Sequence, residues 1–130
     1  MEKILKKSAT ILIVDEIEPC LDFWTGVLGF EMTQSVRNTD KFDFVMLALG
    51  NIEVHLQTKS ATQRDNPGLK IGAPISSILY FDVENIEDLE AKLIKRNDIE
   101  ILKPKHKTFY GTTEIYIREP GKHMLGFAQV

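Results

Sequence analysis

The chain has 130 residues, with 16 basic and 19 acidic side chains and a formal net charge of −3. This length is enough for one domain with its own core, and the charge argues against a nucleic-acid partner. The single cysteine excludes an intrachain disulfide and a cysteine-based metal site, and no apolar run is long enough to cross a membrane. Together these features predict a cytoplasmic protein with no membrane partner.

The first half of the chain predicts a strand, a helix and three further strands. Ile11–Val14 is a continuous apolar run, and apolar residues then recur at helical spacing from Ile17 to Leu28. Pro19 suits the first turn of this helix and Gly29 suits its end. The helical spacing predicts three core residues, which are Cys20, Phe23 and Trp24. Alternating apolar residues predict three strands, at Phe30–Val36, Phe42–Leu49 and Ile52–Gln57.

The second half repeats this order. Ile78–Val83 predicts a strand, and the apolar spacing from Ile86 to Ile94 predicts a helix that Asn85 caps. Three more strands are predicted, at Ile99–Lys103, Thr112–Arg118 and Met124–Val130. The chain therefore reads as two βαβββ modules, at residues 8–58 and 75–130, joined by a connector at 59–74. That connector is either a plain link or a mobile lid over a ligand.

Two segments resemble one known family. Val14–Phe30, with an aromatic pair followed by Val-Leu-Gly-Phe, resembles the opening of the glyoxalase/bleomycin-resistance/extradiol-dioxygenase group, the vicinal oxygen chelate superfamily. Tyr116–Ala128 resembles the final hairpin of that family. The resemblance implies an α+β fold in which two βαβββ modules form an incomplete barrel around a cavity. It also implies a homodimer, and unpaired sheet edges favour the same assembly.

The resemblance also implies where a divalent metal would be held. The matching positions in this chain are Ala9, His55, Ile78 and Gly126. Three of them have no donor atom, and one imidazole is too few for such an ion. We therefore expect no metal and no other cofactor, and no lactoylglutathione lyase or ring-opening dioxygenase activity that depends on a metal.

Period-two alternation predicts which strand residues face the cavity. In Ile52–Gln57 the apolar Ile52, Val54 and Leu56 should pack under the helices. The residues expected to contact a ligand are His55, Tyr80, Tyr116, Glu53, Glu114, Phe44, Gln57 and Met46. For Phe44 and Met46 the alternation leaves the face open. The basic residues Lys103, Lys105, His106 and Lys107 form either a solvated loop or a loop that attracts an anionic substrate.

Three functions fit these residues. The first is a metal-free protein that binds a small hydrophobic or aromatic molecule in the cavity. The second is a lyase, isomerase or dioxygenase that uses an unrecognised metal site, or His55 with a carboxylate such as Glu53 or Glu114. The third is a dimeric interaction protein without a ligand, in which the polar residues only satisfy one another.

Overall fold

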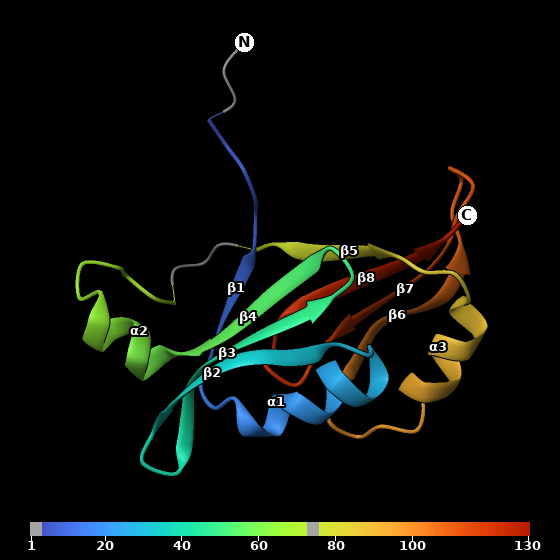
Figure 1. Ribbon diagram of the computed structural model, residues 1–130. Helices are drawn as coiled ribbons and strands as arrows, with labels where there is room; N and C mark the ends of the chain where they lie inside the picture. The colour runs from blue at the N-terminus through green and yellow to red at the C-terminus, as the bar shows by residue number, and fades with distance from the viewer. Residues whose placement is uncertain (1–3, 73–75) are drawn as a thin grey trace. The chain divides into compact units, whose positions relative to one another are not determined.

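The computed structural model of the chain describes residues 4–72 and 76–130 (Figure 1). The chain divides into two compact units, Met1–Ile71 and Gly72–Val130. Residues 73–75, which include the end of the expected connector and the expected start of the second module, lie outside the described residues. No helix in the described ranges is long and apolar enough to cross a membrane.

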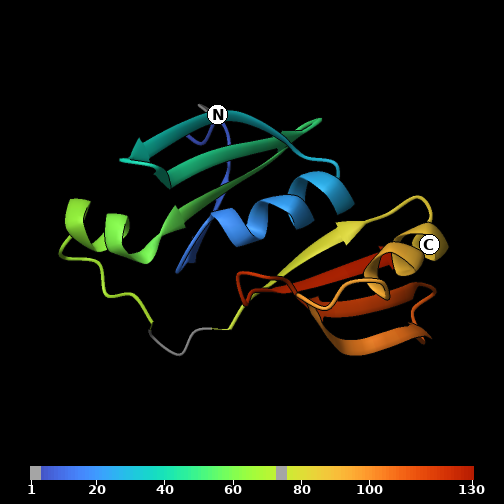
Figure 2. The same ribbon diagram turned by 90° about the horizontal axis from the view of Figure 1, so that it is seen from below.

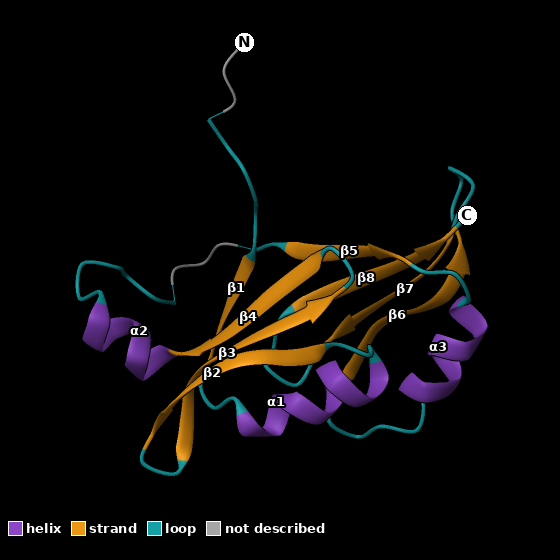
Figure 3. Ribbon diagram, viewed as in Figure 1, coloured by secondary structure: helices purple, strands orange, loops and turns teal. Residues whose placement is uncertain are grey.

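The first unit contains one four-stranded sheet in the order β1-β4-β3-β2, in which only the β1–β4 pair is parallel. Its elements are β1 (Thr10–Val14), α1 (Glu18–Asp22), the π-helical turn η1 (Phe23–Val27), β2 (Glu31–Asn38), β3 (Lys41–Leu49), β4 (Ile52–Thr58) and α2 (Lys59–Asp65). Figure 3 shows α1 beside the strands of this sheet. The predicted order of one strand, one helix and three strands is confirmed.

The predicted helix changes its winding after one turn. Pro19 lies at its start, as predicted, and the helix becomes a π-helix at Phe23. The N–H of Leu28 donates to the carbonyl oxygen of Phe23 at 3.1 Å, which closes the wider turn. Gly29 then adopts a φ of +83°, a conformation that suits glycine and ends the helix. The carboxylate of Glu18 accepts the N–H of Phe42 at 2.6 Å, which holds α1 to β3.

The core of the first unit lies on one face of its sheet. Val45 pairs with Leu56 and Leu47 with Val54 across β3 and β4, and all four are at most 1% exposed. The helix adds Cys20, Phe23 and Trp24, all buried as predicted. The prediction is wrong for Ile52, which is 37% exposed. It is the first residue of β4 and follows the tight turn at Gly50, so the sheet does not cover it.

The segment expected as a connector contains a helix that the sequence analysis missed. Thr58 begins α2 as its cap, because its hydroxyl accepts the N–H of Ala61 at 3.1 Å. Ala61 and Thr62 bury the inner side of this short helix. The sequence does not predict this helix because its buried side consists of one alanine and one threonine, which give no apolar periodicity.

The second unit repeats the topology of the first, with sheet order β5-β8-β7-β6 and one parallel pair, β5–β8 (Figure 2). Its elements are β5 (Ile78–Asp82), α3 (Ile86–Leu93), β6 (Glu100–Lys107), β7 (Thr113–Arg118) and β8 (Met124–Gln129). Asn85 caps α3, as predicted, by accepting the N–H of Asp88 at 3.1 Å. Both units together give the predicted α+β class, with two open four-stranded mixed sheets among the described residues.

The basic segment Lys103–Lys107 is strand, not loop, because β6 continues through it. Lys105 forms ion pairs with Glu87 at 2.5 Å and with Glu90 at 3.2 Å, so its charge is taken up by α3. The prediction that these basic residues form a loop is therefore wrong. The chain continues β6 here because β7 supplies partners as far as Thr113, which pairs with Lys107.

Candidate functional site

Two rows of residues cross one face of the sheet in the second unit. In the first row Tyr80 pairs with Gly126, which pairs with Tyr116. In the second row Asp82 pairs with Ala128, which pairs with Glu114. Residues that pair in register on adjacent strands lie on the same face of a sheet. Tyr80 and Asp82 are alternate residues of β5 and so share a face, and the register adds Tyr116 and Glu114 to that face.

Glu114 is the centre of a hydrogen-bond cluster. Its side chain is fully buried, at 0% exposure. Tyr80 donates its phenol hydroxyl to Glu114 Oε2 in a short hydrogen bond, and Thr112 Oγ1 donates to the same oxygen at 2.9 Å. Tyr110 and Tyr116 each donate a hydroxyl to Oε1 at 2.9 Å. We call the surface formed by Tyr80, Tyr110, Tyr116, Glu114 and Gly126 the tyrosine face.

The cluster fixes the protonation states of its members. Burial raises the pKa of Glu114, but the four hydroxyl donors outweigh it and lower that pKa to about 2. The hydrogen bond to Glu114 raises the pKa of Tyr80 to about 12, and the same carboxylate raises that of Tyr110. Burial and then Glu114 raise the pKa of Tyr116. At neutral pH the carboxylate is therefore charged and all three phenols keep their protons.

The hydroxyl groups turn inward and leave the rings outward. Tyr80 is 50% exposed and Tyr110 is 56% exposed, although each hydroxyl is held by Glu114. On the neighbouring strand His106 lies beside Tyr116, with ring centroids 6.4 Å apart and planes 26° from parallel. The tyrosine face therefore offers aromatic surface to solvent, while its polar atoms already have partners.

Gly126 lies underneath these rings. A Cβ atom at this position would lie 2.7 Å from Cε2 of Tyr116 and 3.2 Å from Cδ1 of Tyr80. Any side chain here would collide with the tyrosines unless they moved. The absence of a side chain at Gly126 is what lets both rings approach the backbone of β8.

A second cluster lies in the first unit, on the sheet face opposite its core. His55 Nε2 and Glu53 Oε1 are 2.7 Å apart, and Lys7 forms a short ion pair with the other oxygen of Glu53. The hydrogen bond from Lys7, and then that from His55, lowers the pKa of Glu53. His55 is 8% exposed, and its ring meets Phe44 edge to face with centroids 5.2 Å apart.

The register of β3 settles the face that alternation left open. Met46 pairs with His55 and Phe44 with Gln57, so these four share one face. All eight residues predicted to contact a ligand thus fall into two groups. One group contains Phe44, Met46, Glu53, His55 and Gln57 in the first unit, and the other contains Tyr80, Glu114 and Tyr116 in the second.

Sequence reasoning missed Tyr110 and Thr112 as members of the Glu114 cluster. Both lie in the turn between β6 and β7, where Gly111 has a φ of +94°. This turn folds back so that the Tyr110 hydroxyl reaches Glu114, four residues later. No periodicity covers such a contact, and only the position of Gly111 beside Tyr110 in the sequence hints at the tight turn.

The residues present do not fit the divalent metal that the family fold implies. Ala9, Ile78 and Gly126 supply no donor atom, and the tyrosine rings cover the Gly126 position. The remaining candidate, His55, already uses Nε2 on Glu53. Within residues 4–72 and 76–130, no group of three or more His, Cys, Asp or Glu side chains is arranged to hold a metal ion.

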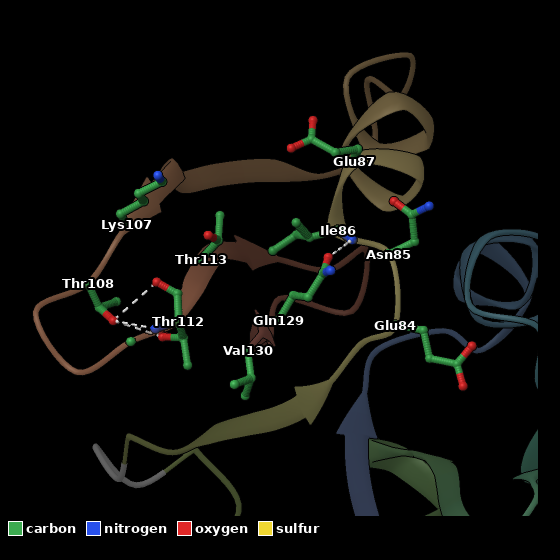
Figure 4. Close-up of a pocket in the computed structure, with 11 residues that line it drawn as sticks. Glu84, Asn85, Ile86, Glu87, Lys107, Thr108, Thr112, Thr113, Gln129 and Val130 are labelled. Atoms are coloured by element: carbon green, nitrogen blue, oxygen red, sulfur yellow. Dashed lines mark hydrogen bonds between the residues drawn. The ribbon is translucent and has the colours of Figure 1, made fainter.

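A separate pocket of about 500 Å³ lies between the start of α3 and the β6–β7 turn (Figure 4). Thr108 and Thr112 line one side, joined by a hydroxyl hydrogen bond of 2.8 Å. On the other side the N–H of Ile86 donates to Gln129 Oε1 at 2.7 Å, and Asn85 caps the helix. These groups are used within the protein, so the pocket does not offer the open helix start that an anion would need.

One comparison with known proteins identifies the family of this chain. The model of the Glyoxalase/Bleomycin resistance protein/Dioxygenase superfamily matches residues 7–127. This match spans nearly the whole chain, and the chain therefore belongs to that superfamily. The two βαβββ units of this chain match the fold of solved structures from that superfamily. A comparison with curated proteins gives no match.

Solved structures of the same fold include three that illustrate its range. A family enzyme from Burkholderia phytofirmans has a TM-score of 0.77 and 20% identity, over 95% of this chain and 97% of that one. TioX from Micromonospora sp. ML1 has a TM-score of 0.76 and 13% identity, over 95% and 98%. A lactoylglutathione lyase from Agrobacterium tumefaciens has a TM-score of 0.74 and 16% identity, over 98% and 95%. At these identities the likeness concerns the fold alone.

Proposed function

We propose that this protein binds a small hydrophobic or aromatic molecule on the tyrosine face without using a metal. The observation that carries the proposal is the arrangement around Glu114. Three phenol hydroxyls are held inward by one buried carboxylate, and two of the rings stay about half exposed. Exposed rings with a few fixed polar groups are typical of small-molecule sites. The loss of donor atoms at Ala9, Ile78 and Gly126 supports binding without a metal.

The test of this proposal is a titration with 1-naphthalenemethanol. Calorimetry measures the heat of binding, and a second experiment measures the shift in melting temperature. A ligand that binds only the folded protein raises its melting temperature. Tyr80→Ala should abolish both signals, because it removes a half-exposed ring and leaves three donors on Glu114. The matched control is Ile94→Ala, which removes an exposed apolar side chain at the end of α3. Equal binding by both variants would contradict the proposal.

The His55–Glu53 pair favours a second candidate function, which is proton transfer. With a neutral ring, Nε2–H donates to Glu53 and the lone pair of Nδ1 is directed elsewhere, as in a general base oriented by a carboxylate. No protein group described here forms a hydrogen bond with Nδ1. An enzyme of this kind would lose its turnover in both His55→Gln and Glu53→Gln, while a binding protein would not depend on them.

We also propose that the protein is cytoplasmic and forms a homodimer, and that it binds neither nucleic acid nor a membrane. The single cysteine supports the cytoplasmic location, and the net charge of −3 argues against binding to nucleic acid or a membrane. The edge strand β2 supports the dimer, because all eight of its residues are exposed and one of its sides has no partner strand among the residues that the structure describes. An interaction protein without a ligand remains the third alternative, and the titration above separates it from a binding protein.

A further inference from the structure

The tyrosine face has a buried negative charge that is held by neutral groups. Glu114 is fully buried and ionised, and its four partners are all neutral hydroxyls. Among the residues that the structure describes, no lysine, arginine or histidine forms an ion pair with it. His106 pairs with Glu114 across the strands, but its Nδ1 is bonded to the carbonyl oxygen of Pro104 at 2.8 Å.

A second acid lies in the same row. Asp82 is exposed on β5, and Ala128 alone separates it from Glu114 across the sheet. Both charges act on Tyr80 in the neighbouring row, since Glu114 and then Asp82 contribute to its raised pKa. Both acids therefore act on the exposed ring of Tyr80, whereas Lys103, the cation that pairs with Tyr116 in the same row, lies on the opposite edge strand β6.

The hydrogen bonds to Glu114 increase the electron density on the faces of the tyrosine rings. The face of an aromatic ring is electron-rich, and it attracts cations that lie within about 6 Å of its centre. A phenol that donates a hydrogen bond to a carboxylate becomes richer still in electron density. Three such phenols surround Glu114, and those of Tyr80 and Tyr110 present exposed rings.

We infer that the tyrosine face selects a ligand that has a positive charge next to its aromatic ring, such as an organic ammonium or an N-alkylated heteroaromatic. This inference rests on the proposed function and adds the charge of the ligand to it. The carboxylate supplies the attraction, and the exposed rings supply the contact surface.

Three probes that share a naphthalene ring test the inference. They are 1-naphthylmethylammonium, 1-naphthalenemethanol and 1-naphthaleneacetate, which are cationic, neutral and anionic. We expect the wild-type protein to bind the cation about tenfold more tightly than the alcohol and the anion least tightly, in calorimetry at low salt. Glu114→Gln keeps the shape and removes that charge, so its preference for the cation over the alcohol should fall to about threefold, the part that Asp82 supplies.

Two further variants keep the inference testable if Glu114→Gln does not fold. Asp82→Asn lies at an exposed position, and it should reduce the preference for the cation about threefold. Asp88→Asn removes an exposed acid from α3 and should leave the preference unchanged. If all three probes bind the wild-type protein equally, the charge inference is wrong and the proposed function stands. If none of them binds, both are wrong.

Discussion

Tyr116 lies directly over Gly126, so close that a Cβ atom on Gly126 would be 2.7 Å from Cε2 of the tyrosine ring. Gly126 is one of the four positions at which the resemblance to the family implies a metal ligand. In this chain the space of that side chain is taken by a ring whose hydroxyl is held by Glu114 at 2.9 Å. The metal position and the tyrosine face therefore exclude each other in this protein.

Gly126→Ala should lower the free energy of unfolding by about 1–3 kcal/mol, because the added methyl group overpacks the site. The Tyr116 ring cannot simply turn aside, since its hydroxyl is bonded to Glu114. Urea unfolding measures this loss. Gly68→Ala is the control, because nothing lies within 4 Å of a Cβ at that exposed position. Equal stability of the two variants would show that the rings do not close over Gly126.

The ionised Glu114 should make the protein lose stability in acid. Its pKa is about 2 in the folded protein, against an ordinary value of 4.5. A lowered pKa stabilises the fold above the ordinary value, and this contribution is lost as the pH falls from about 4.5 to 2. Unfolding free energies measured at several pH values across this range should therefore decline less steeply in Glu114→Gln than in the wild type.

A graded variant checks that the hydroxyl donors cause this effect. Thr112→Val removes one of the four donors and should give an intermediate slope. If the wild type and both variants decline in parallel, the carboxylate is not held by these hydroxyls.

Lys7→Met should raise the pKa of Glu53 toward its ordinary value. The hydrogen bond from Lys7 is the largest cause of the lowered pKa, ahead of the one from His55. Carbon-13 NMR of the side-chain carboxyl groups follows this titration directly. Lys59→Met, at an exposed lysine on α2, serves as the charge-matched control and should leave Glu53 as it is. An unchanged pKa of Glu53 in Lys7→Met would mean that the ion pair does not form in solution.

Light scattering should give twice the chain mass of 14.8 kDa at micromolar concentration. The exposed edge strand β2 is a surface on which a second copy of the chain could pair. Val36→Lys places a charge on this strand at a position that is 54% exposed, and it should weaken the dimer if β2 forms the contact. A monomer mass for the wild-type protein would contradict the dimer proposal.

Much of the fold could be predicted from the sequence because its signals are local. Apolar runs and alternation located every strand, and the cap at Asn85 located the start of α3. Two elements departed from the prediction for physical reasons. The helix α2 has only Ala61 and Thr62 as its buried side, and β6 continues through the lysines because β7 supplies the pairing partners.

The candidate site was less predictable because its contacts join distant residues. His55, Glu114 and Tyr116 could be selected by alternation, and Tyr80 could be selected by the register that the resemblance to the family implies. Their partners could not, since Tyr80 and Glu114 are 34 residues apart and the β6–β7 turn decides that Tyr110 joins them. Likewise, the sequence indicates that Gly126 has no donor atom, but only the packed sheet reveals that two rings cover it.

The proposed binding of an aromatic molecule on the tyrosine face needs no metal. The most direct test is to strip the protein with a chelator, verify by elemental analysis that no metal is left, and titrate it with 1-naphthylmethylammonium in a calorimeter. We expect saturable binding of one molecule per chain that is unchanged when zinc, nickel, iron or manganese is added back and that is lost in Tyr80→Ala. Binding that appears only after a metal is restored, or that survives in Tyr80→Ala, would contradict it.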